Sequence, residues 1–493
     1  MARFRCPTLA LVLASLLIAV LLGGCMLLRP PPPPDPWGEY RAALNSDFEP
    51  PAYLVKALPQ YSITATIDPV ERIYTGTLDL TLPVTGTAPL GELYFRLYPN
   101  LPQFGGRMEI VGARIDEAPV NYSYEAEGTA VHLSLPKPLQ PGQTVKVGLN
   151  FTGFAPKRYS GYYTIFGFSD DVLSLDGFYP ILAGRRDGAW ALDVASPQGD
   201  VGFHDAAFYR VDLITPPDQV IAATGTVITQ TQNAAGLRMT RYVLGPAREF
   251  GLLMSPRFQV EEAETLGTRV RSYALPEDAA AAHSALYDAV AALQIYHDRF
   301  GLYPYRDMSV VQAPLTFRGM EFPGMSLIGN QAYNQYLQNL ETLVVHEVAH
   351  QWWYNQVGSD QPESPWLDEG LAEFSMYYYY LDRYGAPTAQ HLREVRWEFP
   401  VDRAKAQGVD APIGQPVTAY TDNYETIVYG KGALFFLALR DQIGADAFQK
   451  LLRTYLERYR WKIASPADFQ AVAEEVSGQD LSALFQQWVS GKQ

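Results

Sequence analysis

The chain has 493 residues, of which 47% are hydrophobic and 18% are charged. It is too long for one ordinary domain, so its length predicts two or three domains with sizeable cores. Its formal net charge of −15 argues against a nucleic-acid partner, because an acidic surface repels polyanions.

The first 25 residues have the features of a targeting segment. Arg3 and Arg5 give a positive start, residues 9–22 form an apolar core, and small residues precede Cys25. This pattern resembles a bacterial lipoprotein signal, in which Cys25 is lipidated and becomes the mature N-terminus. The alternative is an uncleaved membrane helix, since residues 8–28 carry no charge and about 20 apolar residues span a bilayer. Both interpretations place the rest of the chain outside the cytoplasm.

Residues 26–50 are predicted to form a proline-rich tether. Prolines occupy positions 30–34, and proline runs adopt a stiff extended helix of about 3.1 Å per residue. This segment is therefore expected to lift the folded part off a membrane. The only cysteines are Cys6 and Cys25, so the mature chain is expected to hold no internal disulfide.

Residues 51–265 are predicted to form an N-terminal β domain, an antiparallel sandwich or saddle. Apolar and polar residues alternate over 61–67, 77–82 and 145–151, as they do in half-buried strands. A further strand is predicted at 220–225. Glycine and proline interrupt these segments at short intervals, which is typical of antiparallel sheets.

Residues 266–493 are predicted to be mainly helical, with a small sheet. An alanine-rich amphipathic pattern over 279–300 predicts a helix that Gly301 ends. Residues 308–312 predict a strand. The predicted fold class is therefore α+β, with more than one domain.

Residues 341–354 form an apolar run without glycine or proline, which predicts a buried helix. The run contains a His-Glu-x-x-His motif at 346–350. Because residues four apart share one face of a helix, His346 and His350 can present two imidazoles to one metal ion. Glu347 lies beside that face, where it can reach a water molecule at the metal without being a ligand. This is the pattern of zinc proteases.

A catalytic zinc ion takes a third protein ligand. Glu369 follows His350 after eighteen intervening residues, and turn-forming residues at 355–365 would let a second helix bring it back. One Zn²⁺ per chain is therefore expected, held by His346, His350 and Glu369. Glu373 lies one turn further on the second helix. It is either a carboxylate partner of one histidine or an ordinary solvated glutamate.

At these residues the chain resembles the aminopeptidase N and leukotriene hydrolase family of gluzincin zinc metallopeptidases. The resemblance rests on the motif at 346–350, on Glu369 within Trp-Leu-Asp-Glu-Gly, on Tyr-Gly-Lys-Gly at 429–432 and on Gly-Met-Glu at 319–321. It implies a saddle-like β domain followed by a thermolysin-like catalytic domain. Amphipathic helices predicted between residues 434 and 489 finish that domain, so a member without the family's long C-terminal helical domain is expected.

The resemblance also implies roles for three residues. Glu347 would act as the general base and later as the acid, and Tyr429 would donate a hydrogen bond to the oxyanion of the tetrahedral intermediate. Glu321 would bind the free α-amine of the substrate. These roles together describe an aminopeptidase.

The chain departs from the family pattern in two places. Arg318, Gly319 and Phe322 stand where the family has Gly, Ala and Asn around its amine-binding glutamate. The family's second amine-binding residue, from the β domain, has no recognisable motif here, and residues 176–180 occupy its region. Strict cleavage at the N-terminus is therefore left open.

The expected function is zinc-dependent hydrolysis of peptide bonds outside the cytoplasm, first of all the removal of N-terminal residues. The alternatives are an endopeptidase or dipeptidase on the same zinc site, epoxide opening as in one branch of the family, and a non-catalytic surface binding protein with an inherited peptidase fold. The expected partners are peptides and, through the lipid on Cys25, the membrane.

Overall fold

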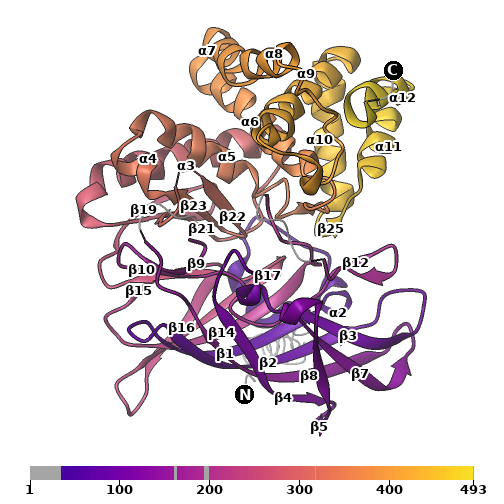
Figure 1. Ribbon diagram of the computed structural model, residues 1–493. Coiled ribbons are helices and arrows are strands. Elements are labelled where there is room, and N and C mark those ends of the chain that lie inside the picture. The colour runs from indigo at the N-terminus through magenta and orange to yellow at the C-terminus, as the bar shows by residue number, and fades with distance from the viewer. Residues whose placement is uncertain (1–34, 160–163, 194–198, 317, 492–493) are drawn as a thin grey trace, which may run out of the picture. The chain divides into compact units, whose positions relative to one another are not determined.

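The computed structural model describes residues 35–159, 164–193, 199–316 and 318–491 (Figure 1). The predicted targeting segment with Cys25 lies outside the described residues, as does the start of the predicted tether. Residues from Glu39 onward form one compact unit. No helix within the described ranges combines the length and the apolar character that crossing a bilayer requires.

The N-terminal half of the described chain is built from strands. Their bounds are β1 Gln60–Asp68, β2 Ile73–Pro83, β3 Leu90–Arg96, β4 Arg107–Ile115, β5 Ala118–Pro119, β6 Tyr122–Glu125, β7 Ala130–Leu139, β8 Thr144–Phe154, β9 Phe166–Ser169, β10 Val172–Leu175, β11 Ile181–Leu182, β12 Arg185–Arg186, β13 Ala189–Trp190, β14 Ala207–Thr215, β15 Val220–Ala223, β16 Thr226–Gln232, β17 Arg238–Ala247 and β18 Leu252–Ser255. They form an eight-stranded sheet in the order β16-β17-β14-β1-β2-β8-β4-β5, two four-stranded sheets (β15-β18-β10-β9 and β11-β3-β7-β6) and the β12-β13 pair. The short helix α2 (Leu54–Ala57) precedes β1.

Strand β1 shows why these residues form sheets. Tyr61, Ile63, Ala65 and Ile67 are buried and alternate with more exposed residues, so the strand has one core face and one outer face. The predicted alternation is confirmed here. One pair departs from the predicted antiparallel arrangement, because β1 pairs antiparallel with β2 but parallel with β14. A parallel pair needs a long crossover connection, and β14 returns to β1 only after the other two sheets have begun.

A separate five-stranded sheet opens the C-terminal half. It consists of β19 (Gln259–Thr265), β20 (Thr268–Ala274), β21 (Asp307–Ala313), β23 (Met325–Gly329) and β22 (Gly319–Phe322), in that order, and a small pair joins β24 (Val357–Gly358) to β25 (Lys462–Ile463). The strand predicted at 308–312 is confirmed as β21. The domain boundary predicted at residue 265 falls in the turn between β19 and β20, which pair with each other, and this boundary stays a prediction.

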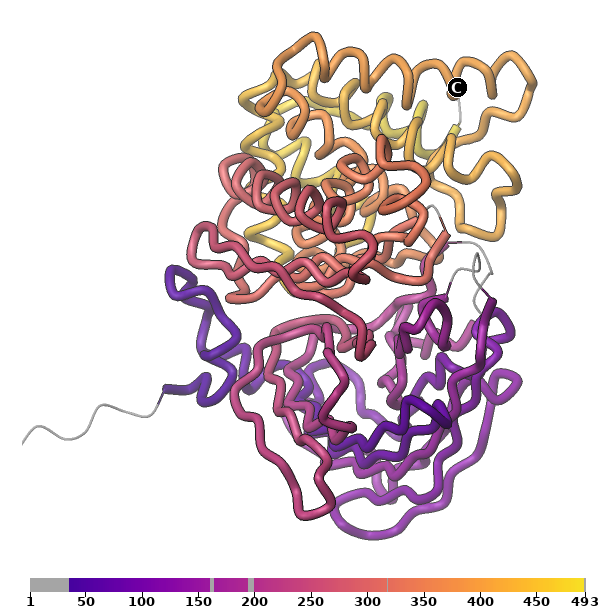
Figure 2. The backbone as a smooth tube through the Cα atoms, turned by 90° about the vertical axis from the view of Figure 1, so that its left-hand side faces the viewer, coloured from indigo at the N-terminus to yellow at the C-terminus, as the bar shows by residue number. Residues whose placement is uncertain are grey.

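Helices make up most of the C-terminal half. Their bounds are α3 Ala279–Phe300, α4 Asn330–Asn334, α5 Leu340–Ala349, α6 Trp366–Tyr384, α7 Ala386–Leu392, α8 Phe399–Ala406, α9 Gly432–Ile443, α10 Ala445–Tyr459, α11 Pro466–Ser477 and α12 Ser482–Phe485, with π-helical turns η6 Arg393–Glu398, η8 Glu425–Lys431 and η9 Gln486–Ser490. Helix α3 packs on β19 and β20, and α5 packs on β22 and β23. Figures 1 and 2 show the helices gathered on the side of the five-stranded sheet away from the N-terminal strands. The predicted α+β fold class is confirmed.

The helices predicted over 279–300 and 341–354 correspond to α3 and α5, and their predicted ends agree with the structure to different degrees. The first is confirmed at both ends, since α3 begins at Ala279 and ends where Gly301 takes a φ of 126° that favours glycine. The second, predicted over 341–354, is wrong at its C-terminal end, because α5 stops at Ala349. The backbone turns at Tyr354, whose φ of 99° no helix accommodates.

Candidate active site

His346 and His350 lie at the C-terminal end of α5, and both side chains are buried. His350 is the first residue after the helix but keeps near-helical backbone angles, with φ −61° and ψ −14°. The four-residue spacing therefore still places both imidazoles on one face. Their Nε2 atoms lie 3.2 Å apart, so one cation can contact both rings.

Helix α6 brings Glu369 to the same point, because it begins directly after Pro365 as the sequence predicts. Oε2 of Glu369 lies 3.2 Å from Nε2 of His346 and 3.3 Å from Nε2 of His350. A regular tetrahedron with edges of this length has its centre about 2.0 Å from each corner, which is the usual Zn–N distance. Among the described residues this group has three members, the ligand number of a catalytic zinc site. His346, His350 and Glu369, called the metal group below, therefore fit zinc.

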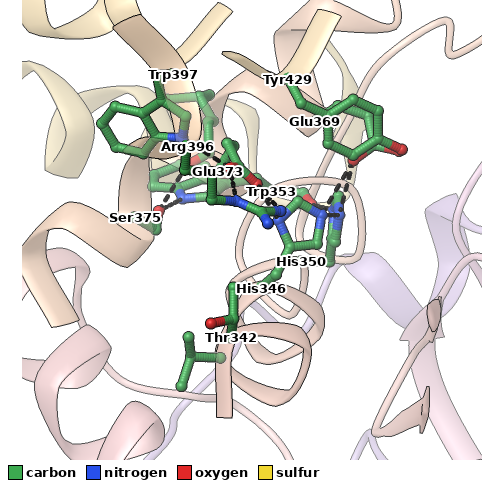
Figure 3. Close-up of polar contacts among 12 residues, drawn as sticks. Thr342, His346, His350, Trp353, Glu369, Glu373, Ser375, Arg396, Trp397 and Tyr429 are labelled. Atoms are coloured by element: carbon green, nitrogen blue, oxygen red, sulfur yellow. Dashed lines mark hydrogen bonds and ion pairs between the residues drawn. The ribbon is translucent and has the colours of Figure 1, made fainter. Parts of the chain in front are cut away.

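The other nitrogen of each imidazole is fixed by a hydrogen-bond acceptor (Figure 3). Nδ1 of His350 lies 3.0 Å from the carbonyl oxygen of Trp353, and Nδ1 of His346 lies 3.1 Å from Oε2 of Glu373. Each ring can thus donate through Nδ1 and keep the lone pair of Nε2 for the metal. Burial raises the pKa of Glu369, but the two histidines outweigh that effect and lower the pKa below its ordinary range, so this ligand is ionised.

Glu373 is buried, so the alternative of a solvated glutamate is wrong. Besides His346, its carboxylate accepts hydrogen bonds from Nε1 of Trp397 at 2.7 Å and from the guanidinium of Arg396. Burial raises the pKa of Glu373, but Arg396 and His346 outweigh it and lower the pKa to about 2. The residue therefore presents a permanent negative charge to the imidazole.

Tyr429 reaches the metal group from the π-helical turn η8. Its hydroxyl donates to Oε1 of Glu369 at 2.6 Å, and its ring stacks on His346 with 5.6 Å between the centroids. Burial raises the pKa of Tyr429 well above its ordinary value, so the phenol remains a donor. A Cβ added to Gly370 would lie 3.2 Å from Cα of Gly432, so α6 and α9 approach each other through two glycines. This close approach explains the glycine in each motif.

Glu347 points from α5 towards strand β22. A Cβ added to Gly319 would lie 2.1 Å from Oε1 of Glu347, so the glycine that replaces the family's alanine gives this carboxylate its space. Burial raises the pKa of Glu347 to about 8, although His346 and His350 act against it. A carboxylate that titrates near neutral pH can both accept and return a proton.

Glu321 lies on β22, with its carboxylate beside the metal group. Its Oε1 accepts a hydrogen bond from Nε2 of Gln361 at 3.0 Å, and its backbone carbonyl accepts one from Nδ2 of Asn355 at 3.1 Å. One ligand atom from each of Glu321, Glu347 and His350 lies within 4.8 Å of the others. A ligand group paired with Glu321 therefore lies about one amino-acid residue away from the metal group.

Asp176 is a site residue that the sequence did not single out. It follows strand β10, is buried, and lies close enough to Glu321 for the two charges to interact. Burial, and then the charge of Glu321, raise the pKa of Asp176 to about 7. It is the first residue of the segment 176–180, in which no amine-binding motif is recognisable. The sequence could not single it out, because Asp176 comes close to Glu321 only when the β domain packs on β22.

The fold and the metal group are those of a zinc metallopeptidase. Residues 284–488 match the model of the peptidase family M1 domain. This part of the chain is similar to peptidase family M1, the aminopeptidase N family, and His346, His350 and Glu369 within it are the zinc ligands.

Known relatives and solved structures extend the likeness beyond that domain. The chain is 24% identical to aminopeptidase M1-A of Oryza sativa subsp. japonica over 84% of its own length and 48% of the relative's. It is 30% identical to glutamyl aminopeptidase of Homo sapiens over 39% of its own length and 19% of the relative's. The chain thus spans less than half of either relative. A mutant M1 zinc metallopeptidase from Deinococcus radiodurans has the same fold, with a TM-score of 0.67, 21% identity and coverage of 88% of this chain and 94% of that one.

Replacing Asp176 by Asn should change how stability depends on pH. The folded protein raises the pKa of Asp176 from 3.8 to about 7, so between these values it binds more protons than the unfolded chain. The free energy of unfolding therefore falls as pH rises through this window, and Asp176→Asn should remove that loss, on the order of 2 kcal/mol. Urea unfolding at pH 5 and pH 8 measures it. Equal losses in wild type and variant would contradict the prediction.

Proposed function

We propose that the protein is a zinc-dependent aminopeptidase that removes N-terminal residues from peptides. The observation that carries this proposal is the position of Glu321, whose carboxylate lies within 4.8 Å of donor atoms of Glu347 and His350. In a peptide, the α-amine nitrogen and the first carbonyl carbon are about 2.5 Å apart. An ammonium group paired with Glu321 therefore presents the first peptide bond, and no later one, to the metal group.

The comparisons support this function. The rice and human relatives both carry the name aminopeptidase. A mutant of the Deinococcus radiodurans M1 zinc metallopeptidase, which has the same fold with a TM-score of 0.66 and 20% identity, is described as bound to a Tyr-Ser-Ala substrate. Peptides are therefore the proposed substrate class of this chain.

The chemistry divides between the metal group and two further side chains. When held by its three ligands, zinc supplies a Lewis acid beside the scissile carbonyl. Glu347 takes a proton from the attacking water and returns it to the leaving amine, for which a pKa of about 8 is suitable. Tyr429 turns its hydroxyl from Glu369 to the developing oxyanion, and removing one such donor typically costs about 10²–10³ in rate.

Two carboxylates select the substrate, and they are called the amine site below. Glu321 pairs with the α-ammonium group, and Asp176 supplies the second amine-binding side chain that the β domain contributes in this family. Burial raises the pKa of each carboxyl, so the folded protein disfavours the ionised carboxylates. A cation that pairs with them stabilises their charges. Glu373 orients His346 and does not touch the substrate.

Glu321→Ala should separate an aminopeptidase from an endopeptidase. Removing one partner of a buried charge pair costs about 2–5 kcal/mol, so kcat/KM on aminoacyl amides should fall about 10²-fold or more. The assay compares aminoacyl amides with their N-acetylated forms, which the wild type should leave intact. Glu347→Gln provides the blank, and Glu363→Ala, an exposed carboxylate two residues from Gln361, is the matched control. Wild-type cleavage of the acetylated substrates at a comparable rate would indicate an endopeptidase.

We also propose that the enzyme works outside the cytoplasm, anchored to a membrane by a lipid on Cys25. The support is the sequence: a positive start, an apolar core and small residues before the cysteine. Of the predicted tether 26–50, only the part before Glu39 would then act as a tether, because residues from Glu39 onward belong to the compact unit and Leu44 pairs with Tyr305. Residues 51–265 would be the β domain and 266–493 the catalytic domain. In this arrangement the active site meets peptides beyond the membrane surface.

The two cysteines allow a direct test of the anchor. In a bacterial host, Cys25→Ser should move the protein from the membrane fraction to the soluble fraction and abolish incorporation of radiolabelled palmitate. Cys6→Ser is the matched control and should keep both properties. A Cys25→Ser protein that remains in the membrane would instead indicate the uncleaved helix at residues 8–28.

A further inference from the structure

Tyr354 has an unusual backbone conformation. It lies in the turn after α5 with a φ of 99°, a region that residues with a side chain rarely adopt. Such a conformation costs about 1–3 kcal/mol and persists only where the surroundings hold it in place. The side chain is buried, at 3% exposure, so solvent does not determine its position.

The segment between β17 and β18 holds Tyr354 at both its backbone and its side chain. Nε of Arg248 donates to the carbonyl oxygen of Tyr354 at 2.6 Å. The hydroxyl of Tyr354 donates to Oε1 of Glu249 at 3.0 Å. The guanidinium of Arg248 is itself buried and donates also to the carbonyl oxygens of His204 and Lys462. Two consecutive residues of the N-terminal half therefore fix this one tyrosine.

Glu249 lies near the amine site, because Tyr354, which donates to it, and Gln361, which donates to Glu321, both lie against Gly202. Burial raises the pKa of Glu249 well above its ordinary value, and the charges of Asp176 and Glu321 raise it further. The hydrogen bond from Tyr354 and the charge of Arg248 lower the pKa and so favour the ionised carboxylate. Nε2 of His204 lies 3.7 Å from Oε2 of Glu249, and burial lowers the pKa of that histidine to about 3, so it brings no charge.

A second contact joins Tyr354 to the amine site. A Cβ added to Gly202 would lie 2.8 Å from the hydroxyl of Tyr354 and 3.2 Å from Oε1 of Gln361. Gln361 is the residue that donates to Glu321. Tyr354, which holds Glu249, and Gln361, which holds Glu321, therefore both lie against Gly202. The missing side chain of this glycine leaves room for both.

We propose that Tyr354 is a positioning residue of the amine site, which acts by holding Glu249 as a third carboxylate beside Asp176 and Glu321. The inference rests on the proposed aminopeptidase function. Burial disfavours the charge of Glu249, but the hydrogen bond from Tyr354 and an arriving ammonium group both favour the ionised carboxylate. That charge then attracts the ammonium group equally in the ground state and in the transition state, because the amine takes no part in bond breaking. Losing it should therefore raise KM and leave kcat unchanged.

Tyr354→Phe tests this role, because it keeps the ring and removes the hydroxyl. On leucine p-nitroanilide, KM should rise about tenfold, the size expected when a charged group loses one hydrogen bond, with kcat within about twofold of the wild type. Tyr303→Phe is the matched control, since the hydroxyl of Tyr303 is also buried but donates to the backbone of Asp307. Its KM should stay at the wild-type value.

Glu249→Gln and the double variant separate positioning from packing. If Tyr354 acts through the charge of Glu249, then Tyr354→Phe should raise KM no further in the Glu249→Gln background. Additive effects would overturn the inference. An unchanged KM in Tyr354→Phe would also overturn the positioning role of Tyr354. The proposed aminopeptidase function would still stand if the protein cleaves substrates with a free amine.

A binding measurement decides the inference even if the proposed function fails. Calorimetric titration of L-leucinamide into the Glu347→Gln protein, which prevents turnover, measures the amine site alone. Adding Tyr354→Phe should raise the Kd about tenfold. An unchanged Kd, or no binding by the parent protein, would overturn the inference.

Discussion

Three donor atoms held 3.2–3.3 Å apart inside the protein are the constraint on which the rest of the site depends. Two imidazole nitrogens and a carboxylate oxygen keep this spacing because α5 and α6 pack against each other and α3 packs on both. The contact between Gly370 and Gly432 then brings η8 and its tyrosine to the same point. The packing of these helices therefore holds the three ligand atoms at the spacing that zinc requires.

Around this metal group the protein gathers carboxylates that oppose its own stability. Burial raises the pKa of Asp176, Glu249 and Glu321, which means that folding disfavours their charges. The protein keeps them close together all the same, on segments from both halves of the chain. Stability given up at a binding site is common in enzymes, and here a cationic substrate group would recover it.

The metal group could be predicted from the sequence because short-range geometry determines it. Helical periodicity alone places His346 and His350 on one face of the helix, and the turn residues before Pro365 let Glu369 return. The bounds of α3 were likewise predictable, since Gly301 ends the helix locally.

The amine site and the end of α5 could not be predicted in this way. Asp176 meets Glu321 only when two halves of the chain pack together, and no local spacing signals it. The helix predicted to Tyr354 ends early although residues 341–354 contain no helix breaker. The contacts that hold Tyr354 in its turn come from Arg248, 106 residues away, and from Glu249. The β1–β14 pair was missed for the same reason, because a crossover brings those strands together.

The central claim is that α5 and α6 hold one zinc ion with two imidazoles and one carboxylate. X-ray absorption at the zinc edge, combined with metal analysis of the purified protein, tests it most directly. The purified protein should carry one zinc per chain with two imidazole nitrogens in its coordination shell, and Glu369→Ala should lose that zinc. A protein that carries no zinc, or a zinc shell without two imidazoles, would contradict it.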